Sequence, residues 1–160
     1  MFQQIVKTDN NLASLVLRVI LGSIIIVHGY EKLGAGFAPF MDYFVGVLKM
    51  PKFLGWLTVF IETTSCLLLI IGLATRINAV MVFGLFVGMI VFVHWQDGFL
   101  MNWFGKMEKG HEGFEYHLLV LAMSAALVVL GGGAYSLDKF FMNEEKSIAK
   151  KQQVKEELYA

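Results

Sequence analysis

The run that decides the fold is Leu12–Leu33, LASLVLRVILGSIIIVHGYEKL, which is almost entirely apolar until its last few residues. Its length matches the roughly 20 residues that a helix needs to cross a bilayer. It is too long for the apolar core of a signal peptide, it contains Arg18, and no small-residue cleavage site follows it. We therefore interpret it as a retained membrane helix.

The composition of the whole chain indicates the same class of protein. Apolar residues make up 57% of the 160 residues and charged residues 16%, with a mean hydropathy of +0.64. In soluble domains, about 45–50% of the residues are apolar and about 25% are charged. The net charge of zero provides no basic patch, so no nucleic-acid partner is predicted. The one cysteine, Cys66, excludes an intramolecular disulfide, a CxxC pair and a cysteine-based zinc site.

Three more apolar segments follow the first, so the sequence predicts an all-α protein, a four-helix transmembrane bundle. The predicted spans cover residues 12–33, 53–73, 77–95 and 114–133. Short interfacial helices are expected in loops one and three. The predicted organisation is a transmembrane domain over residues 1–138 and a charged cytoplasmic tail over 139–160. In the third span, Gly84-x-x-x-Gly88 has the spacing that allows close helix contact.

Four spans would place both chain ends on one side of the membrane. The basic residues on that side are Lys7, Arg76, Lys139, Lys146, Lys150, Lys151 and Lys155, against Lys32, Lys49, Lys52, Lys106 and Lys109 on the other. Because basic residues are enriched in cytoplasmic segments, this difference predicts that both termini are cytoplasmic.

Ionisable residues gather at one depth of the predicted bundle. His28 lies about 7–8 Å below the outer end of the first span, and Glu62 about 13–14 Å below that of the second. His94, Glu115 and His117 lie at the outer ends of the third and fourth spans. Each helix thus supplies a histidine or a carboxylate to the outer half. Because the short side chain of His28 cannot reach the interface, we expect it to be buried.

These side chains suit a proton-coupled redox ligand, since neutral histidines beside carboxylates transfer protons near pH 7. A quinone has two carbonyl acceptors and an apolar tail. In this hypothesis His28 or His94 donates to a quinone oxygen and Glu62 relays the proton. The candidates for ligand binding are Lys32 at the rim, Glu115, His117 and Trp103. The alternative is that His94, Glu115 and His117 are interfacial groups in contact with water.

No metal site and no covalently bound cofactor are predicted, because the histidines lack i,i+4 or HxH spacing. Arg18 lies about 9 Å from the cytoplasmic end of the first span. Two interpretations stay open for it: extension to the interface, or a buried ion pair with Glu62. Arg76 lies at the cytoplasmic turn. Arg18 and Arg76 are together predicted to stabilise the cytoplasmic half as a structural ion-pairing set.

The chain resembles the DoxX family over Leu12 to Asp138. The ordered motifs are Arg18-x-x-Leu21-Gly22, His28-Gly29-x-x-Lys32-Leu33, Ile61-Glu62 followed by Leu67–Arg76, His94, Gly113-x-Glu115-Tyr116 and Ser136-Leu137-Asp138. Cys66 stands where many members have glycine, which affects local helix packing.

The resemblance implies a four-helix protein of the bacterial inner membrane in a redox or quinone setting. The family takes its name from a subunit of a thiosulfate:quinone oxidoreductase. We therefore expect a membrane subunit of a redox complex, surrounded by lipid, whose partner redox or envelope protein carries the redox centre. A non-enzymatic membrane adaptor, and less readily a small proton-coupled transporter, remain alternatives, and self-association into a homo-oligomer is left open.

Overall fold

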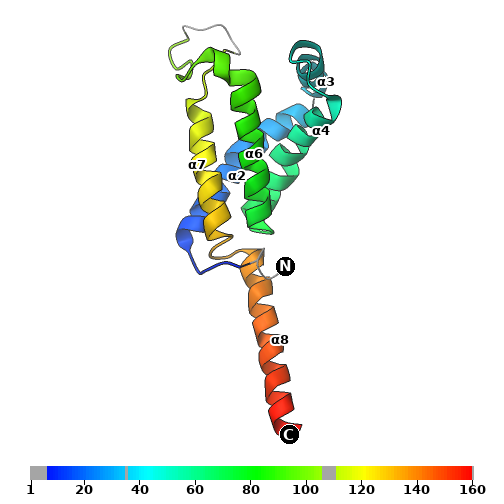
Figure 1. Ribbon diagram of the computed structural model, residues 1–160, viewed down its shortest axis with the longest axis vertical. Coiled ribbons are helices and arrows are strands. Elements are labelled where there is room, and N and C mark those ends of the chain that lie inside the picture. Colours follow the sequence, from blue (N-terminus) through cyan, green and yellow to red (C-terminus); the bar gives the residue numbers. More distant parts are fainter. Residues whose placement is uncertain (1–6, 35, 106–110, 160) are drawn as a thin grey trace.

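The computed structural model describes residues 7–34, 36–105 and 111–159, without the side chains of 145–151, 154 and 157–159. Throughout this described part the chain is helical and contains no strand (Figure 1). Three apolar helices are long enough to cross a membrane: Leu12–Leu33, Lys52–Ile71 and Thr75–Asp97. Glu115–Leu130 is a shorter apolar helix. The predicted fold class, an all-α helical membrane bundle, is confirmed.

The first helix, α2 (Leu12–Leu33), has the predicted bounds. Asn11 caps its start, accepting a hydrogen bond from the amide of Ala13 at 2.8 Å. Gly22 and Gly29 form the face that packs on the second span. A Cβ atom at Gly22 would lie 2.8 Å from the Cys66 carbonyl oxygen, and one at Gly29 would lie 2.8 Å from the Glu62 carbonyl carbon. Hydrogen in place of a side chain thus lets the two backbones touch.

The second and third spans are each interrupted by one π-helical turn. The second comprises α4 (Lys52–Phe60), the π turn η2 (Ile61–Ser65) and α5 (Cys66–Ile71). The third comprises α6 (Thr75–Met89), the π turn η3 (Ile90–His94) and the 3₁₀ turn η4 (Trp95–Asp97). Such bulges occur frequently at functional sites. Here η2 contains Glu62 and η3 ends at His94, two of the predicted site residues.

Glycines move two predicted helix ends. The second span ends at Ile71, not 73, because Gly72 takes a left-handed conformation with φ 71°. The helix at the last predicted span, α7 (Glu115–Leu130), does not reach 133, because Gly131 and Gly133 have φ of 78° and 73° and turn the chain. Its 16 residues correspond to about 24 Å of helix.

Loop one contains the predicted short helix, as α3 (Phe37–Asp42) followed by the π turn η1 (Tyr43–Val47). The helix predicted in loop three is not found within the described residues, where only η4 is helical. Instead the loop folds back on itself. The amides of Gly113 and Phe114 donate to the carbonyls of Leu100 and Gly98, both at 3.1 Å, which uses backbone groups that a helix would need. Residues 106–110 lie outside the described part.

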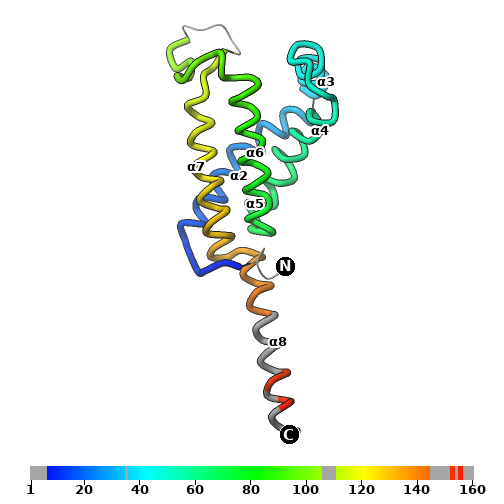
Figure 2. The backbone as a smooth tube through the Cα atoms, viewed as in Figure 1, coloured from blue at the N-terminus to red at the C-terminus, as the bar shows by residue number. Residues whose placement is uncertain are grey.

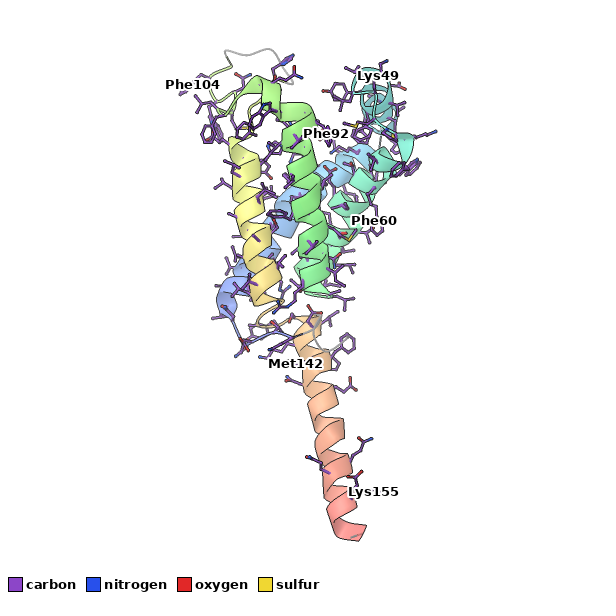
Figure 3. The ribbon with its side chains drawn as sticks, in the orientation of Figure 1. Lys49, Phe60, Phe92, Phe104, Met142 and Lys155 are labelled. Carbon is purple, nitrogen blue, oxygen red and sulfur yellow. The ribbon has the colours of Figure 1, made fainter. Side chains whose placement is uncertain are left out.

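The helices form two packed pairs that cross. In Figure 1, α6 and α7 run side by side, and α2 passes obliquely behind them to the end where α3 and α4 lie. The buried core between them includes Leu21, Ile25, Leu69, Val82, Phe86 and Leu127. Large apolar side chains also cover the outside of the helices, among them Phe60 and Phe92, which are 46% and 62% exposed (Figure 3). An apolar exterior around an apolar core suits a lipid environment.

The tail forms one helix, α8 (Leu137–Tyr159), which extends away from the bundle (Figure 2). Its start meets the N-terminal segment. The amide of Ala134 donates to the Asn11 carbonyl at 3.0 Å, and the amide of Gly133 donates to the Thr8 hydroxyl at 2.6 Å. The described N-terminal residues and α8 therefore lie at the same end of the bundle.

Candidate functional site

At the α8 end of the bundle, Arg18 is 1% exposed and its guanidinium binds backbone carbonyls. The acceptors are Gly132 (2.9 Å), Ala134 (3.1 Å), Tyr135 (3.0 Å), Leu69 (3.4 Å) and Ile70. These carbonyls belong to the end of α5 and to the turn after α7. At such positions the backbone lacks the amide donors that a continuing helix would supply. Both predicted interpretations of Arg18 are therefore wrong: its side chain does not extend to the interface, and its described partners do not include Glu62.

Arg76 also binds carbonyls, those of Lys7 (3.1 and 3.2 Å) and Val128 (2.6 Å). Among the described residues, Arg18 and Arg76 are therefore not engaged in the predicted ion pairs. Both instead donate hydrogen bonds to backbone carbonyls where the chain turns. A buried acidic residue at this end, Asp138, is 1% exposed and accepts hydrogen bonds from the amides of Ala74 (2.7 Å) and Thr75 (2.9 Å). It caps the start of α6.

At the opposite end, Glu62 pairs with Lys32. The Lys32 Nζ lies 2.5 Å from the Glu62 Oε2, and the Glu62 side chain is 2% exposed. Lys32 also sits 5.3 Å from the centre of the Phe40 ring in α3. The lysine lies one turn after Gly29, where α2 touches η2, so the glycine contact brings ammonium and carboxylate together. Glu62, for which an ion pair with Arg18 was one of the two predictions, therefore has Lys32 of the neighbouring helix as its partner.

His94 and His117 lie beside this pair, with ring centres 4.4 Å apart and ring planes tilted by 45°. The His94 Nδ1 lies 2.8 Å from the carbonyl oxygen of Glu112. Because a carbonyl only accepts, Nδ1 carries the proton, and in the neutral ring Nε2 is an acceptor. The predicted donation from a neutral His94 to a quinone oxygen is therefore wrong for this arrangement. The ring is set up to accept a hydrogen bond or a proton from a ligand hydroxyl.

An inner cavity of about 330 Å³ lies between α2, η2, η3 and α7, and Lys32, Glu62, His94, Tyr116 and His117 are among its lining residues. The hydroxyl of Tyr116 and the Nδ1 of His117 are buried and have no hydrogen-bond partner in the described part of the chain. Unpaired buried polar atoms are uncommon and cost about 1–3 kcal/mol each. These two atoms therefore favour an occupant with polar groups of its own.

An outer cavity of about 660 Å³ adjoins the inner one and shares Lys32, Glu62, His94 and Glu112 with it. Its remaining walls come from loop one, from α4, from the outer part of the third span and from both ends of loop three. Both volumes fall within the range of about 300–1,000 Å³ typical of ligand sites. The Lys32–Glu62 pair lies where the two cavities meet.

His28 lines the inner cavity but is exposed, so the expectation of burial was wrong. The reason is the position of the glycine contact. Gly29 is the residue that faces η2, and His28, one residue earlier, is rotated away from that contact.

Glu115 and Trp103 contact each other and do not line the inner or the outer cavity. The Glu115 carboxylate accepts from the Met101 amide at 3.0 Å and from the Trp103 indole Nε1 at 3.2 Å. Neither residue is among the described ones that line the inner or outer cavity. The geometry assigns them to the support of loop three, not to the ligand-binding role predicted for them.

Replacing Glu115 by alanine should therefore loosen loop three. Two hydrogen bonds to a carboxylate are lost, and we expect about tenfold faster amide exchange at Met101. Hydrogen–deuterium exchange of the full chain in nanodiscs measures this. Glu31→Ala, which removes an exposed carboxylate, serves as control. Unchanged exchange in Glu115→Ala would contradict this role.

Tyr116 was not among the site residues predicted from the sequence. Its only signals were its place beside His117 and within Gly113-x-Glu115-Tyr116. The carbonyl of Glu112, which orients His94, could not have been found from residue types, because every residue has a carbonyl.

Comparison with known proteins identifies the family to which the chain belongs. The DoxX family model matches residues 13–95. The chain is also 31% identical over 136 residues to the Bacillus subtilis (strain 168) protein named "Putative oxidoreductase CatD", covering 85% of this chain and 92% of that protein. No solved structure matches the chain. The matched segment contains α2, except its first residue, and all three described π turns, with Lys32, Glu62 and His94, and the chain belongs to the DoxX family.

Proposed function

We propose that the chain is a membrane subunit of a redox complex that binds a quinone-like molecule in the inner and outer cavities. The observation that carries the proposal is the cavity pair itself. A buried ion pair, two histidine rings in contact, and the two residues with unpartnered polar atoms, Tyr116 and His117, line a space large enough for one aromatic head group.

The polar groups suit the reduced, hydroxyl-bearing form of such a ligand. The Nε2 of neutral His94 accepts from a quinol hydroxyl, and the unpartnered Tyr116 hydroxyl is free to donate to the second oxygen. Glu62, held against Lys32, is the next acceptor for a proton that leaves His94. Electrons go to a partner protein, since the sequence offers no cysteine pair and no cofactor motif of its own.

The proposed setting is the bacterial inner membrane, with four spans and both termini in the cytoplasm. The apolar exterior, the family and the oxidoreductase name of the relative support a membrane redox role. In this orientation the cavities face the outer leaflet, and α8 extends into the cytoplasm, where a partner can contact it.

The test measures the binding of 2,3-dimethyl-1,4-naphthoquinol to the full chain in nanodiscs. The readout is the quenching of tryptophan fluorescence. Glu62 lines both cavities, so in this proposal its carboxylate also accepts directly from a ligand hydroxyl. Because hydrogen bonds to charged groups contribute about 1.5–3 kcal/mol, Glu62→Gln should weaken binding by about tenfold or more. Glu31→Gln, one residue from Lys32 but exposed, should leave the affinity unchanged.

Since Glu62→Gln leaves a lysine without its partner, the paired variant Lys32→Met with Glu62→Gln keeps the charge balanced. It should fold and still bind weakly. Wild-type affinity in both variants, or no binding to the wild type, would overturn the proposal. In either case, a requirement for residues 140–160 in cells would then favour the adaptor alternative.

A further inference from the structure

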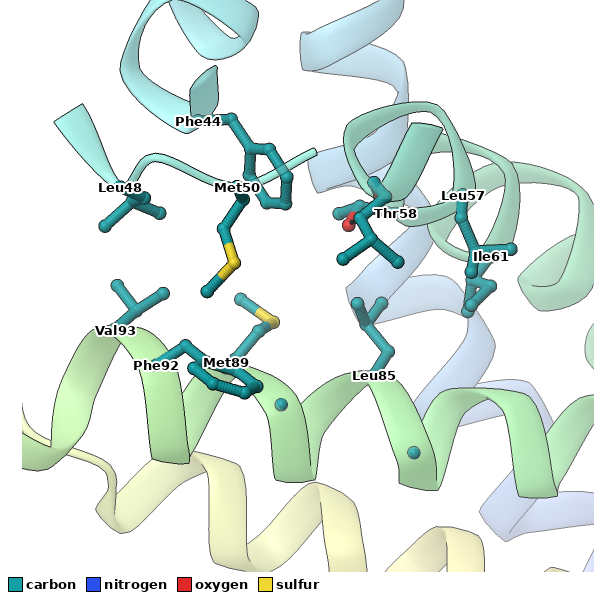
Figure 4. Close-up of a pocket in the computed structure, with 13 residues that line it drawn as sticks. Phe44, Leu48, Met50, Leu57, Thr58, Ile61, Leu85, Met89, Phe92 and Val93 are labelled. Atoms are coloured by element: carbon teal, nitrogen blue, oxygen red, sulfur yellow. Dashed lines mark hydrogen bonds between the residues drawn. The ribbon is translucent and has the colours of Figure 1, made fainter. Parts of the chain in front are cut away.

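A third space, an apolar groove of about 220 Å³, lies between α4 and α6 (Figure 4). Gly84 and Gly88 of α6 form one wall, and a Cβ atom at either position would meet nothing within 4 Å. The predicted close helix contact at Gly84-x-x-x-Gly88 is thus not made by any described residue of this chain. The absence of side chains there creates a depression in the surface of α6.

The facing walls of the groove are hydrocarbon. Leu54, Leu57 and Ile61 come from the second span, and Phe44 and Leu48 come from loop one. The polar side chain in the lining, Thr58, donates its hydroxyl to the Leu54 carbonyl at 2.9 Å. The hydroxyl hydrogen is therefore already used within α4, so the groove suits an occupant without polar groups.

The apolar groove leads into the polar site. Phe44, Leu48, Thr58, Met89, Phe92 and Val93 line both the groove and the outer cavity. From there the outer cavity reaches Lys32 and Glu62. The three spaces together thus have a polar end and an apolar end. Such a shape fits an amphiphile with one compact head and one hydrocarbon tail.

The charges of the outer cavity discriminate between amphiphiles. Its described lining residues include three carboxylates, Glu62, Asp97 and Glu112. Lys32 is paired with Glu62, and the His111 Nδ1 lies 2.8 Å from the Asp97 Oδ1, so the basic groups of the lining are already engaged. A phosphate head group would add negative charge to this set, and like charges at close range repel. An uncharged head that donates hydrogen bonds fits the same lining better.

We propose that the apolar groove holds the tail of the ligand whose head occupies the two cavities, so that the ligand is a long-tailed isoprenoid quinone drawn from the lipid phase, not a small water-soluble quinone. This inference rests on the proposed function. It makes Gly84 and Gly88 specificity-determining residues, since they leave the space that the tail fills.

The experiment compares two reduced ligands with the same naphthoquinol ring in zwitterionic nanodiscs. One is menaquinol-4, which has an isoprenoid tail, and the other is 2,3-dimethyl-1,4-naphthoquinol, which has none. In the double variant Gly84→Leu with Gly88→Leu, the leucine side chains fill the groove. The affinity for menaquinol-4 should fall by about tenfold, which is the loss expected when about two methylene groups of the tail are no longer buried. Affinity for the tailless ring should stay within about twofold.

Val80→Leu is the control, because it adds bulk to an exposed position on α6 outside the groove lining. It should change neither affinity. Equal loss for both ligands, or loss for neither, would overturn the groove as the tail site while leaving the head site in place. Wild-type chain that binds neither ring would overturn the proposed function and this inference together.

A second copy of the chain is the competing occupant of the groove. Sedimentation in detergent settles this, because the tail proposal expects the same mass for the wild type and for Gly84→Leu with Gly88→Leu. A wild-type dimer that becomes a monomer in this variant would show that another copy covers the groove, and would overturn the proposal.

Discussion

Replacing Arg18 by leucine should lower the free energy of unfolding by about 3 kcal/mol or more and the unfolding temperature by roughly 10 °C. Leucine fills part of the space but leaves the carbonyls of Gly132 and Ala134 without the donor that Arg18 supplies. Arg18→Lys keeps the charge, but it lacks the planar fork that reaches several acceptors, so its stability should be intermediate.

The chain offers its own reporter for this measurement. Cys66 is the one cysteine, and it is fully buried, so a thiol-reactive dye responds only as the bundle opens. Arg76→Leu is the matched control, because Arg76 is partly exposed and its acceptors include the Lys7 carbonyl at the end of the described chain. Arg18→Leu that unfolds within about 2 °C of the wild type would contradict the role assigned to this arginine.

A second large effect is expected at Gly29, where alanine should destabilise the bundle by about 1–3 kcal/mol. The new methyl group would lie 2.6 Å from the Thr63 Cγ2 and 2.8 Å from the Glu62 carbonyl carbon. Since the second of these is backbone, α2 and η2 must separate. This separation also draws Lys32 away from Glu62, so quinol binding should weaken together with stability.

Gly46→Ala is the comparison, because a methyl group there meets nothing within 4 Å. In helical backbone it should be neutral or stabilising by up to about 1 kcal/mol. Adding Thr63→Ser to Gly29→Ala removes the Cγ2 contact, keeps the hydroxyl that donates to the Val59 carbonyl, and should restore part of the loss. If Gly29→Ala and Gly46→Ala had equal stability, the close contact between α2 and η2 would be refuted.

The π turns within the second and third spans, η2 and η3, are a feature of the site that could not be predicted from the sequence. Counting residues along straight helices placed Glu62 and His94 at the right end of the bundle, because depth depends only on the rise per residue. The direction in which each side chain points depends on rotation about the helix axis. A π turn shifts that rotation, and no residue type in Ile61–Ser65 or Ile90–His94 announces one.

The sequence by itself determined the class of protein, the bounds of α2 and the end of the bundle at which the polar site lies. These follow from apolar content and from local spacing, which act through the immediate neighbours of each residue. Only the tertiary structure decided the pairings: Lys32 with Glu62, Arg18 with the carbonyls of the chain turns, and Glu115 with Trp103. Which charge meets which depends on where helices touch, and here two glycines of α2 set that contact.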